Sequence, residues 1–366
     1  MANLADYLQW RGDLRFSQVE PGEVDCLIFA ALSYVDFGGV VPAGFQGGVT
    51  LSAATRAILA LEKPEERVRV KNDLKLLEAA GASPRFADAE LFYYQNEFLP
   101  EEESQFAAVS FRLPTGQVVM AFRGTDNTLV GWKEDFNMSF QARVPAQEKA
   151  RYYTEAFAAV SGCPLILCGH SKGGNLAVYA AAQCRSEYRG RIESCYNYDG
   201  PGFGPDTMQE SGYLSAVPKI RTFVPESSVI GMLLEHEEPY RVVKSRQISI
   251  MQHELYSWEV LGGGFIEAEE VDSDARHFNL AVKTWLSGKT MQERNEFVDA
   301  VYELLRQGEA EKPSDLILPK NVLSYLRTLS DDEQMRAMIR SEFSSFVQSL
   351  IRIRRRGDAP ALGSGK

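Results

Sequence analysis

Short apolar runs alternate with longer amphipathic segments over residues 1–290. Runs of buried-strand length occupy residues 106–113, 117–122, 164–168, 192–198 and 220–224, and a further strand is expected within 240–251. Helical periodicity is found at 23–35, 51–62, 65–80, 145–161 and 176–184. The turn residues Pro114-Thr115-Gly116 between the first two strands predict a hairpin. Strands that alternate with helices in this way indicate a mostly parallel sheet covered by helices on both faces.

The hydrophobic pattern changes after residue 290. Residues 291–307, 319–329 and 331–353 have helical periodicity with no strand-like run between them. We therefore expect an α/β domain over residues 1–290, a helical C-terminal extension over 291–355 and a disordered tail over 356–366.

Composition and charge narrow the class of protein. The chain has 366 residues, of which 45% are hydrophobic and 24% charged, so it can bury a large core. Its formal net charge of −11 disfavours nucleic-acid binding, because an acidic surface repels phosphate. The basic run at residues 352–356 has two interpretations: contact with an anionic membrane surface or RNA, or a solvated helix end. We favour the helix end, because cations suit the C-terminal end of a helix dipole.

The cysteines and the N-terminal segment bear on the cellular compartment. Five cysteines, an odd number without a C-x-x-C pair, argue against a disulfide framework or a structural zinc site and fit a reducing compartment. The first residues carry Asp6 and Asp13 rather than a basic-then-apolar pattern, so no signal peptide is expected. Because no apolar stretch is long enough to cross a bilayer, we expect a cytoplasmic protein.

The strongest motif is Gly169-His170-Ser171-Lys172-Gly173, which fits G-x-S-x-G between a predicted strand and a predicted helix. A serine nucleophile needs such a tight strand-to-helix turn, and small flanking residues let the chain approach closely. The turn also directs the Lys172 backbone N–H toward a developing oxyanion. The alternative is a phosphate-binding loop, but neither G-x-x-x-x-G-K-S/T nor G-x-G-x-x-G matches here.

Two segments, in this order along the chain, resemble the class 3 (fungal-type) lipases. The segment from Ala121 to Thr125 reads A-F-R-G-T, and the segment from Gly169 to Gly174 resembles that family's nucleophile elbow. The resemblance covers roughly residues 90–260 and is greatest to a bacterial branch with an extended F-R-G-T-D…G-W-K-E-D-F segment. It implies an α/β-hydrolase fold and gives Thr125 the role of second oxyanion donor.

A serine hydroxyl needs a general base, and the chain has four histidines. His253 lies in an H-x-x-Y segment that resembles the family's catalytic D-H-x-x-Y, and it follows both the nucleophile and the candidate acids in chain order, as the base does in this fold. His277, which opens a predicted helix, is the second candidate. We interpret His170, inside the elbow, and His236 as structural.

The acid of a catalytic triad is harder to assign. The family's aspartate position, after the next-to-last strand, is occupied by Ser228 in this chain. Asp199 and Glu226 are the two substitutes. We favour Asp199, because it directly follows a predicted strand, at the sheet edge where sites of open α/β sheets assemble.

These residues predict a serine hydrolase that cleaves carboxylic esters through an acyl-enzyme. Its substrate would be a small-molecule or lipid ester, with peripheral lipid contact as an open alternative. No cofactor is expected, and the lack of H-E-x-x-H disfavours a zinc hydrolase. Two other functions remain open: a non-catalytic lipid-binding protein, suggested by Ser228, and a thioesterase or acyltransferase that uses the same serine.

Overall fold

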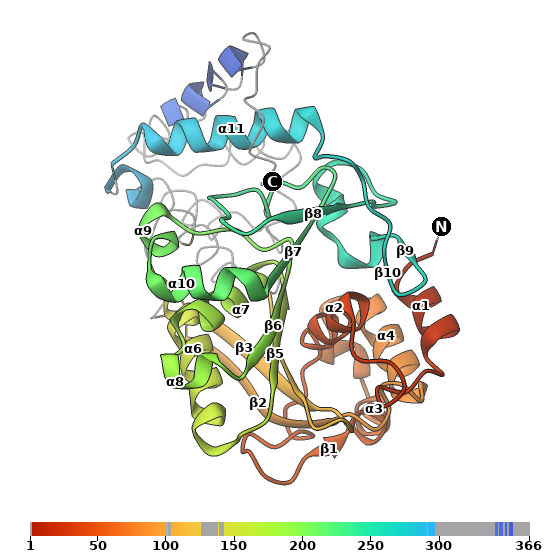
Figure 1. Cartoon of the computed structure of the whole chain (residues 1–366). Coiled ribbons are helices and arrows are strands. Elements are labelled where there is room, and N and C mark those ends of the chain that lie inside the picture. Colours follow the sequence, from red (N-terminus) through yellow and green to blue (C-terminus); the bar gives the residue numbers. More distant parts are fainter. Residues whose placement is uncertain are drawn as a thin grey trace.

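The computed structural model describes residues 2–99, 101, 104–125, 138, 143–290, 292–296 and 341–353 without 343, 347 and 350. Within this part of the chain, an eight-stranded sheet carries its strands in sequence order (Figure 1). The strands are β1 (Val49–Thr50), β2 (Glu90–Leu99), β3 (Ser104–Arg112), β4 (Val118–Phe122), β5 (Leu165–His170), β6 (Ile192–Tyr198), β7 (Ile220–Pro225) and β8 (Tyr240–Val243). Strands β1 to β4 pair antiparallel and β4 to β8 pair parallel.

Helices cover both faces of this sheet (Figure 1). The N-terminal layer consists of α1 (Leu4–Arg11), α2 (Glu23–Leu32), α3 (Leu51–Leu59), η1 (Pro64–Arg67) and α4 (Lys71–Ala82). The opposite layer consists of α6 (Pro145–Val160), α7 (Lys172–Gln183), α8 (Ser186–Arg189), α9 (Pro205–Met208), α10 (Ser211–Ala216) and η3 (Val217–Lys219). The remaining elements are η4 (Ser249–His253), η5 (Leu255–Ser257), the small sheet of β9 (Val260–Leu261) and β10 (Gly264–Phe265), and α11 (Ser273–Ser287).

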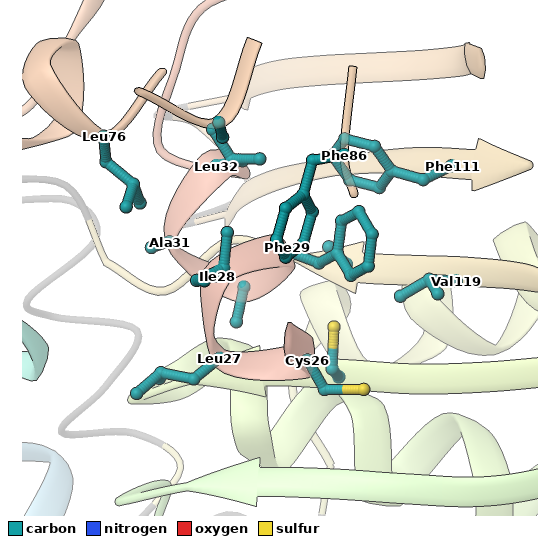
Figure 2. Close-up of a cluster of buried hydrophobic side chains, with 14 of the residues drawn as sticks. Cys26, Leu27, Ile28, Phe29, Ala31, Leu32, Leu76, Phe86, Phe111 and Val119 are labelled. Atoms are coloured by element: carbon teal, nitrogen blue, oxygen red, sulfur yellow. The ribbon is translucent and has the colours of Figure 1, made fainter. Parts of the chain in front are cut away.

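Helix α2 fixes the N-terminal layer on the sheet because it is apolar on nearly every side. All of its residues from 24 to 32 are buried. Figure 2 shows its side chains against the strands, where the Phe29 ring lies 4.7 Å from Phe111 and 5.3 Å from Phe86, between centroids. Burying each such side chain contributes about 1.5–3 kcal/mol. The layer is therefore part of the hydrophobic core.

Most elements of the α/β domain lie where the sequence predicts them. Strands β3 and β4 form the predicted hairpin, with Ala108 opposite Phe122. Strand β2 is not predicted, because a bulge between Phe92 and Gln95 breaks the alternation that reveals a strand. The lipase-like α/β-hydrolase fold implied by the sequence is confirmed by the central sheet, its parallel half and the two helical layers.

The described part of the expected C-terminal extension contacts α11. The Trp285 indole N–H donates to Glu342 at 3.2 Å, Lys289 pairs with Glu342 at 2.7 Å, and the rings of Phe278 and Phe346 are 5.6 Å apart. Most of residues 291–355, and the whole expected tail, lie outside the described residues, so these boundaries stay predictions. None of the described helices combines the length and apolar composition that crossing a bilayer requires.

Candidate active site

Ser171 lies at the tight turn between β5 and α7. Its backbone has a φ of 60° and a ψ of −133°, a left-handed conformation that serine seldom adopts. The Ser171 N–H donates to the Tyr198 carbonyl at 2.9 Å, and the Ser171 carbonyl accepts from the Gly174 N–H at 2.9 Å. These bonds hold the strained turn immediately before the first residue of α7, where the helix dipole favours negative charge.

Two glycines make this turn sterically feasible. A Cβ atom on Gly169 would lie 2.1 Å from the Gly173 carbonyl oxygen, and one on Gly173 would lie 2.1 Å from the Phe122 carbonyl oxygen. Neither approach leaves room for a side chain. The spacing G-x-S-x-G therefore reflects close packing of the elbow on itself and on β4.

The parallel strands end side by side at the edge that carries Ser171. In the register of β5, β6 and β7, His170 lies opposite Tyr198, and Tyr198 lies opposite Phe223. The residues that follow these strands thus share one sheet edge, as in other open α/β sheets. Asp199 follows β6 there and, like Ser171, has a positive φ, of 53°.

Asp199 and His253 are in direct contact. The Nδ1 atom of His253 lies 2.6 Å from Oδ2 of Asp199, whose side chain is fully buried, while the histidine side chain is 25% exposed. A carboxylate only accepts hydrogen bonds, so Nδ1 carries the proton. The neutral ring then keeps its lone pair on Nε2, which is the tautomer that a general base requires.

Ser228 supports this carboxylate. Its hydroxyl donates to Oδ1 of Asp199 at 2.5 Å, and the Gly231 N–H donates to the same oxygen at 3.1 Å. Hydrogen bonds of this kind stabilise the charged form of a buried carboxylate. The serine at the position where the resemblance leads one to expect an aspartate is therefore a hydrogen-bond partner of the acid candidate on the neighbouring strand.

A buried ion pair lies behind Gly231. The His236 Nε2–H donates to the Gly231 carbonyl at 2.7 Å, and its Nδ1–H donates to Glu238 at 3.1 Å. Burial alone would lower the pKa of His236, but the hydrogen bond and charge of Glu238 outweigh it and raise that pKa. Burial likewise opposes ionisation of Glu238, yet His236 and the Thr222 hydroxyl hold the pKa of Glu238 below its usual value. His236 thus has a structural place, as the sequence suggests.

In the described part of the chain, neither of the remaining candidates, His277 and Glu226, is hydrogen-bonded to Asp199 or to His253. His277 is half-buried in the first turns of α11. Glu226 is half-buried, and its backbone carbonyl accepts from the Asp272 N–H at 2.7 Å, which ties the loop after β7 to α11. Of the two carboxylates that the sequence offers, the structure brings Asp199 to His253.

The candidate oxyanion donors flank the elbow. A Cβ atom on Gly124 would lie 2.5 Å from the His170 carbonyl oxygen and 3.2 Å from the Ser171 Cβ, so the segment that leads into Thr125 packs against the nucleophile turn. Lys172 is the first residue of α7, and its side chain is buried, with Nζ donating to the Gln105 carbonyl at 2.9 Å.

From its position among acidic residues of the sequence, Arg123 is expected to pair with a nearby carboxylate, and in the structure it donates to the Asn96 side chain at 2.9 Å. The carboxylates proposed for it are Asp126, Glu134 and Asp135, and all three lie outside the described residues. Its ion pair therefore stays a prediction, whereas the bond to β2 anchors the arginine in the sheet.

Sequence reasoning missed one buried amide pair. The Gln147 side chain donates to Oδ1 of Asn175 at 2.8 Å, and Asn175 donates to the carbonyls of Pro201 and Gly202, both at 3.0 Å. The pair ties the loop after Asp199 to α7. Its sequence signal is an asparagine inside the otherwise small and apolar start of α7.

Comparison with protein families gives one assignment: the profile of the Mbeg1-like family matches residues 80–303, which is more than half of the chain. The chain belongs to the Mbeg1-like family. The matched range of this Mbeg1-like protein contains Ser171, Asp199 and His253. It begins inside α4 and leaves most of the N-terminal layer outside. Comparison with curated proteins gives no match.

Solved lipase structures are similar to this chain at low identity. The M37 lipase is 13% identical, with a TM-score of 0.39, and the alignment covers 66% of this chain and 84% of that chain. The Rhizomucor miehei lipase in its propeptide complex is 11% identical, with a TM-score of 0.37 and coverage of 66% and 80%. A fungal lipase–inhibitor complex is 13% identical, with a TM-score of 0.34 and coverage of 47% and 70%.

Proposed function

We propose that this Mbeg1-like protein hydrolyses carboxylic esters with Ser171, His253 and Asp199 as its catalytic triad. The observation that carries the proposal is the 2.6 Å contact between Asp199 and Nδ1 of His253, at the sheet edge that also carries Ser171 on its strained strand-to-helix turn. A nucleophile, a histidine with an available Nε2 and a buried carboxylate form the constellation that activates serine in unrelated hydrolases.

The reaction then proceeds in two halves. The Ser171 hydroxyl attacks the ester carbonyl carbon while His253 takes its proton at Nε2. His253 returns this proton to the leaving alcohol, and the acyl group stays on Ser171. A water molecule, deprotonated by the same histidine, releases the acid.

The oxyanion of each tetrahedral intermediate accepts from the backbone amides of Thr125 and Lys172. Each such donor lowers the barrier by about 3 kcal/mol. The position of Gly124 against the elbow supports a donor at Thr125, and the place of Lys172 at the start of α7 supports the other.

The test is covalent labelling of the full-length protein with a fluorophosphonate probe, combined with hydrolysis of short p-nitrophenyl esters. We expect wild type to be labelled on Ser171 and to hydrolyse the esters. Ser171→Ala should lose both properties with an unchanged circular dichroism spectrum, because the flanking glycines keep the turn. Ser52→Ala, which removes a serine of α3 bound to Arg56, should behave as wild type.

The outcome separates this proposal from the other functions. A wild-type protein that neither reacts with the probe nor hydrolyses any of the esters would contradict the proposal and favour a lipid-binding protein. If wild type is labelled on Ser171 but hydrolyses thioesters faster than esters, Ser171 is still the nucleophile. The leaving group is then a thiol rather than an alcohol. The suggestion of an inactive scaffold arose from Ser228, and the contact of Asp199 with His253 supports the catalytic alternative.

A further inference from the structure

The loop that carries His253 is anchored to the N-terminal layer by several contacts. This loop comprises η4 and η5. The guanidinium of Arg69 donates two hydrogen bonds to the Glu254 carboxylate, at 3.0 and 3.1 Å. The Tyr256 hydroxyl donates to Asp73 at 2.7 Å. The two contacts connect residues one and three positions after His253 with Arg69, just before α4, and with Asp73, in its first turn.

Arg69 is itself held in a fixed geometry. Its guanidinium lies 4.6 Å above the centroid of the Tyr34 ring and 3.9 Å from Asp73, and its side chain is only 15% exposed. A bidentate arginine–carboxylate pair with an aromatic ring beneath it has one preferred arrangement, unlike a surface lysine pair. The Arg69–Glu254 pair can therefore define the position of the chain beside His253.

His170 supplies a second link, through its two ring nitrogens. Nδ1 lies 2.9 Å from the Tyr34 hydroxyl, and Nε2 lies 2.8 Å from the backbone carbonyl of His253. A carbonyl only accepts, so Nε2 carries the proton and Nδ1 accepts from the tyrosine. Burial, followed by the electrostatic effects of His253, when it is protonated, and of Arg69, holds the pKa of His170 well below its usual value. The neutral ring thus connects Tyr34 to the backbone of the base.

We propose that Arg69 and Tyr34 are positioning residues for His253, and that the N-terminal layer sets the geometry of the general base. This inference rests on the proposed function of His253. The ring of His253 is fixed by Asp199, but its backbone is held by His170 and its neighbour by Arg69. Tyr34, Arg69 and Asp73 lie outside the range matched by the Mbeg1-like family, whereas His170, Asp199 and Glu254 lie inside it. Part of the support of the base therefore comes from outside that range.

The test compares Arg69→Ala, Arg69→Lys, Glu254→Gln and Tyr34→Phe with Arg67→Ala as the matched control. Arg67 pairs with Asp36 at 3.0 Å, in the same layer but away from the His253 loop. We expect Arg69→Ala and Glu254→Gln each to lower kcat by about tenfold or more with KM nearly unchanged, because misplacing a catalytic group slows the chemical step. The double variant should have a kcat no lower than that of Arg69→Ala alone, since both substitutions remove the same Arg69–Glu254 pair. Arg69→Lys should recover part of the rate.

Hydrogen exchange of the backbone amides of residues 249–257 gives a readout that does not depend on turnover. We expect faster exchange in Arg69→Ala and in Tyr34→Phe than in wild type or Arg67→Ala. Unchanged exchange in this loop, or a wild-type kcat in Glu254→Gln, would overturn the positioning role. An inactive wild type whose loop exchange responds to Arg69→Ala would instead reject the proposed ester hydrolysis and leave the anchoring of the loop intact.

Discussion

The two halves of the Asp199–His253 pair are supported in different ways. The acid is fully buried, and its partners Ser228 and Gly231 come from the loop that follows the adjacent strand β7. The base is 25% exposed, and the chain around it is held by His170 and by residues of the N-terminal layer. One half is thus fixed by neighbouring strand ends, and the other by contacts between distant parts of the sequence.

This difference predicts how substitutions around the acid and around the base act on the site. A buried carboxylate with short-range donors is fixed once the parallel strands pair, because β6 and β7 place their ends together. A histidine on a loop depends on whatever packs against that loop. We therefore expect variants on the acid side to alter the charge of the site, and variants on the base side to alter its geometry.

Replacing the base gives the largest expected effect. His253→Ala should lower kcat/KM for p-nitrophenyl esters by a factor on the order of 10⁵ or more, because no other group then takes the serine proton. His277→Ala is the matched control and should retain nearly full activity, since that histidine lies on α11. The reverse pattern in steady-state kinetics would make His277 the base. The contacts that hold His253 would then not support the general base.

Asp199→Asn tests the acid half. An amide in this place keeps the shape but holds the imidazole in the wrong tautomer, so turnover should fall by on the order of a thousandfold or more. Glu226→Gln is the control and should change kcat little, because the structure places Asp199, not Glu226, at the His253 ring. Equal losses in the two variants would show that the carboxylate of the β7 loop shares the role.

The elements that could be read from the sequence are those encoded locally. The elbow at Ser171 and the hairpin of β3 and β4 have fixed spacings of glycine, proline and apolar residues. Asp199 could be preferred because it directly follows a strand. Predicting its contact with His253, which lies 54 positions further along the chain, depended on the assumption that the ends of parallel strands lie together.

The support of the base could not be read in this way. Arg69 and Glu254 are 185 positions apart, and Tyr34 and His170 are 136 apart. His170 lies in the elbow motif and Glu254 in the H-x-x-Y segment, but neither motif specifies a partner in the N-terminal layer. An arginine before a helix is common on solvated surfaces, so Arg69 gives no signal of its own. The two pairs form only when α2 packs its apolar sides against the sheet and brings the N-terminal layer over the elbow.

The smallest expected effect concerns Ser228, at the position where the class 3 resemblance leads one to expect the acid. Ser228→Ala removes one donor to Asp199 and retains the Gly231 N–H, so the carboxylate loses part of its support. A hydrogen bond to a charged group contributes about 1.5–3 kcal/mol, and the remaining donor limits the loss, so we expect kcat to fall by about tenfold. Ser227→Ala is the control, because the Ser227 hydroxyl donates to Asp272 rather than to Asp199. If Ser228→Ala matches wild type in kcat, the acid does not depend on this hydroxyl, and the support of Asp199 reduces to the Gly231 N–H and the packing of the buried loop.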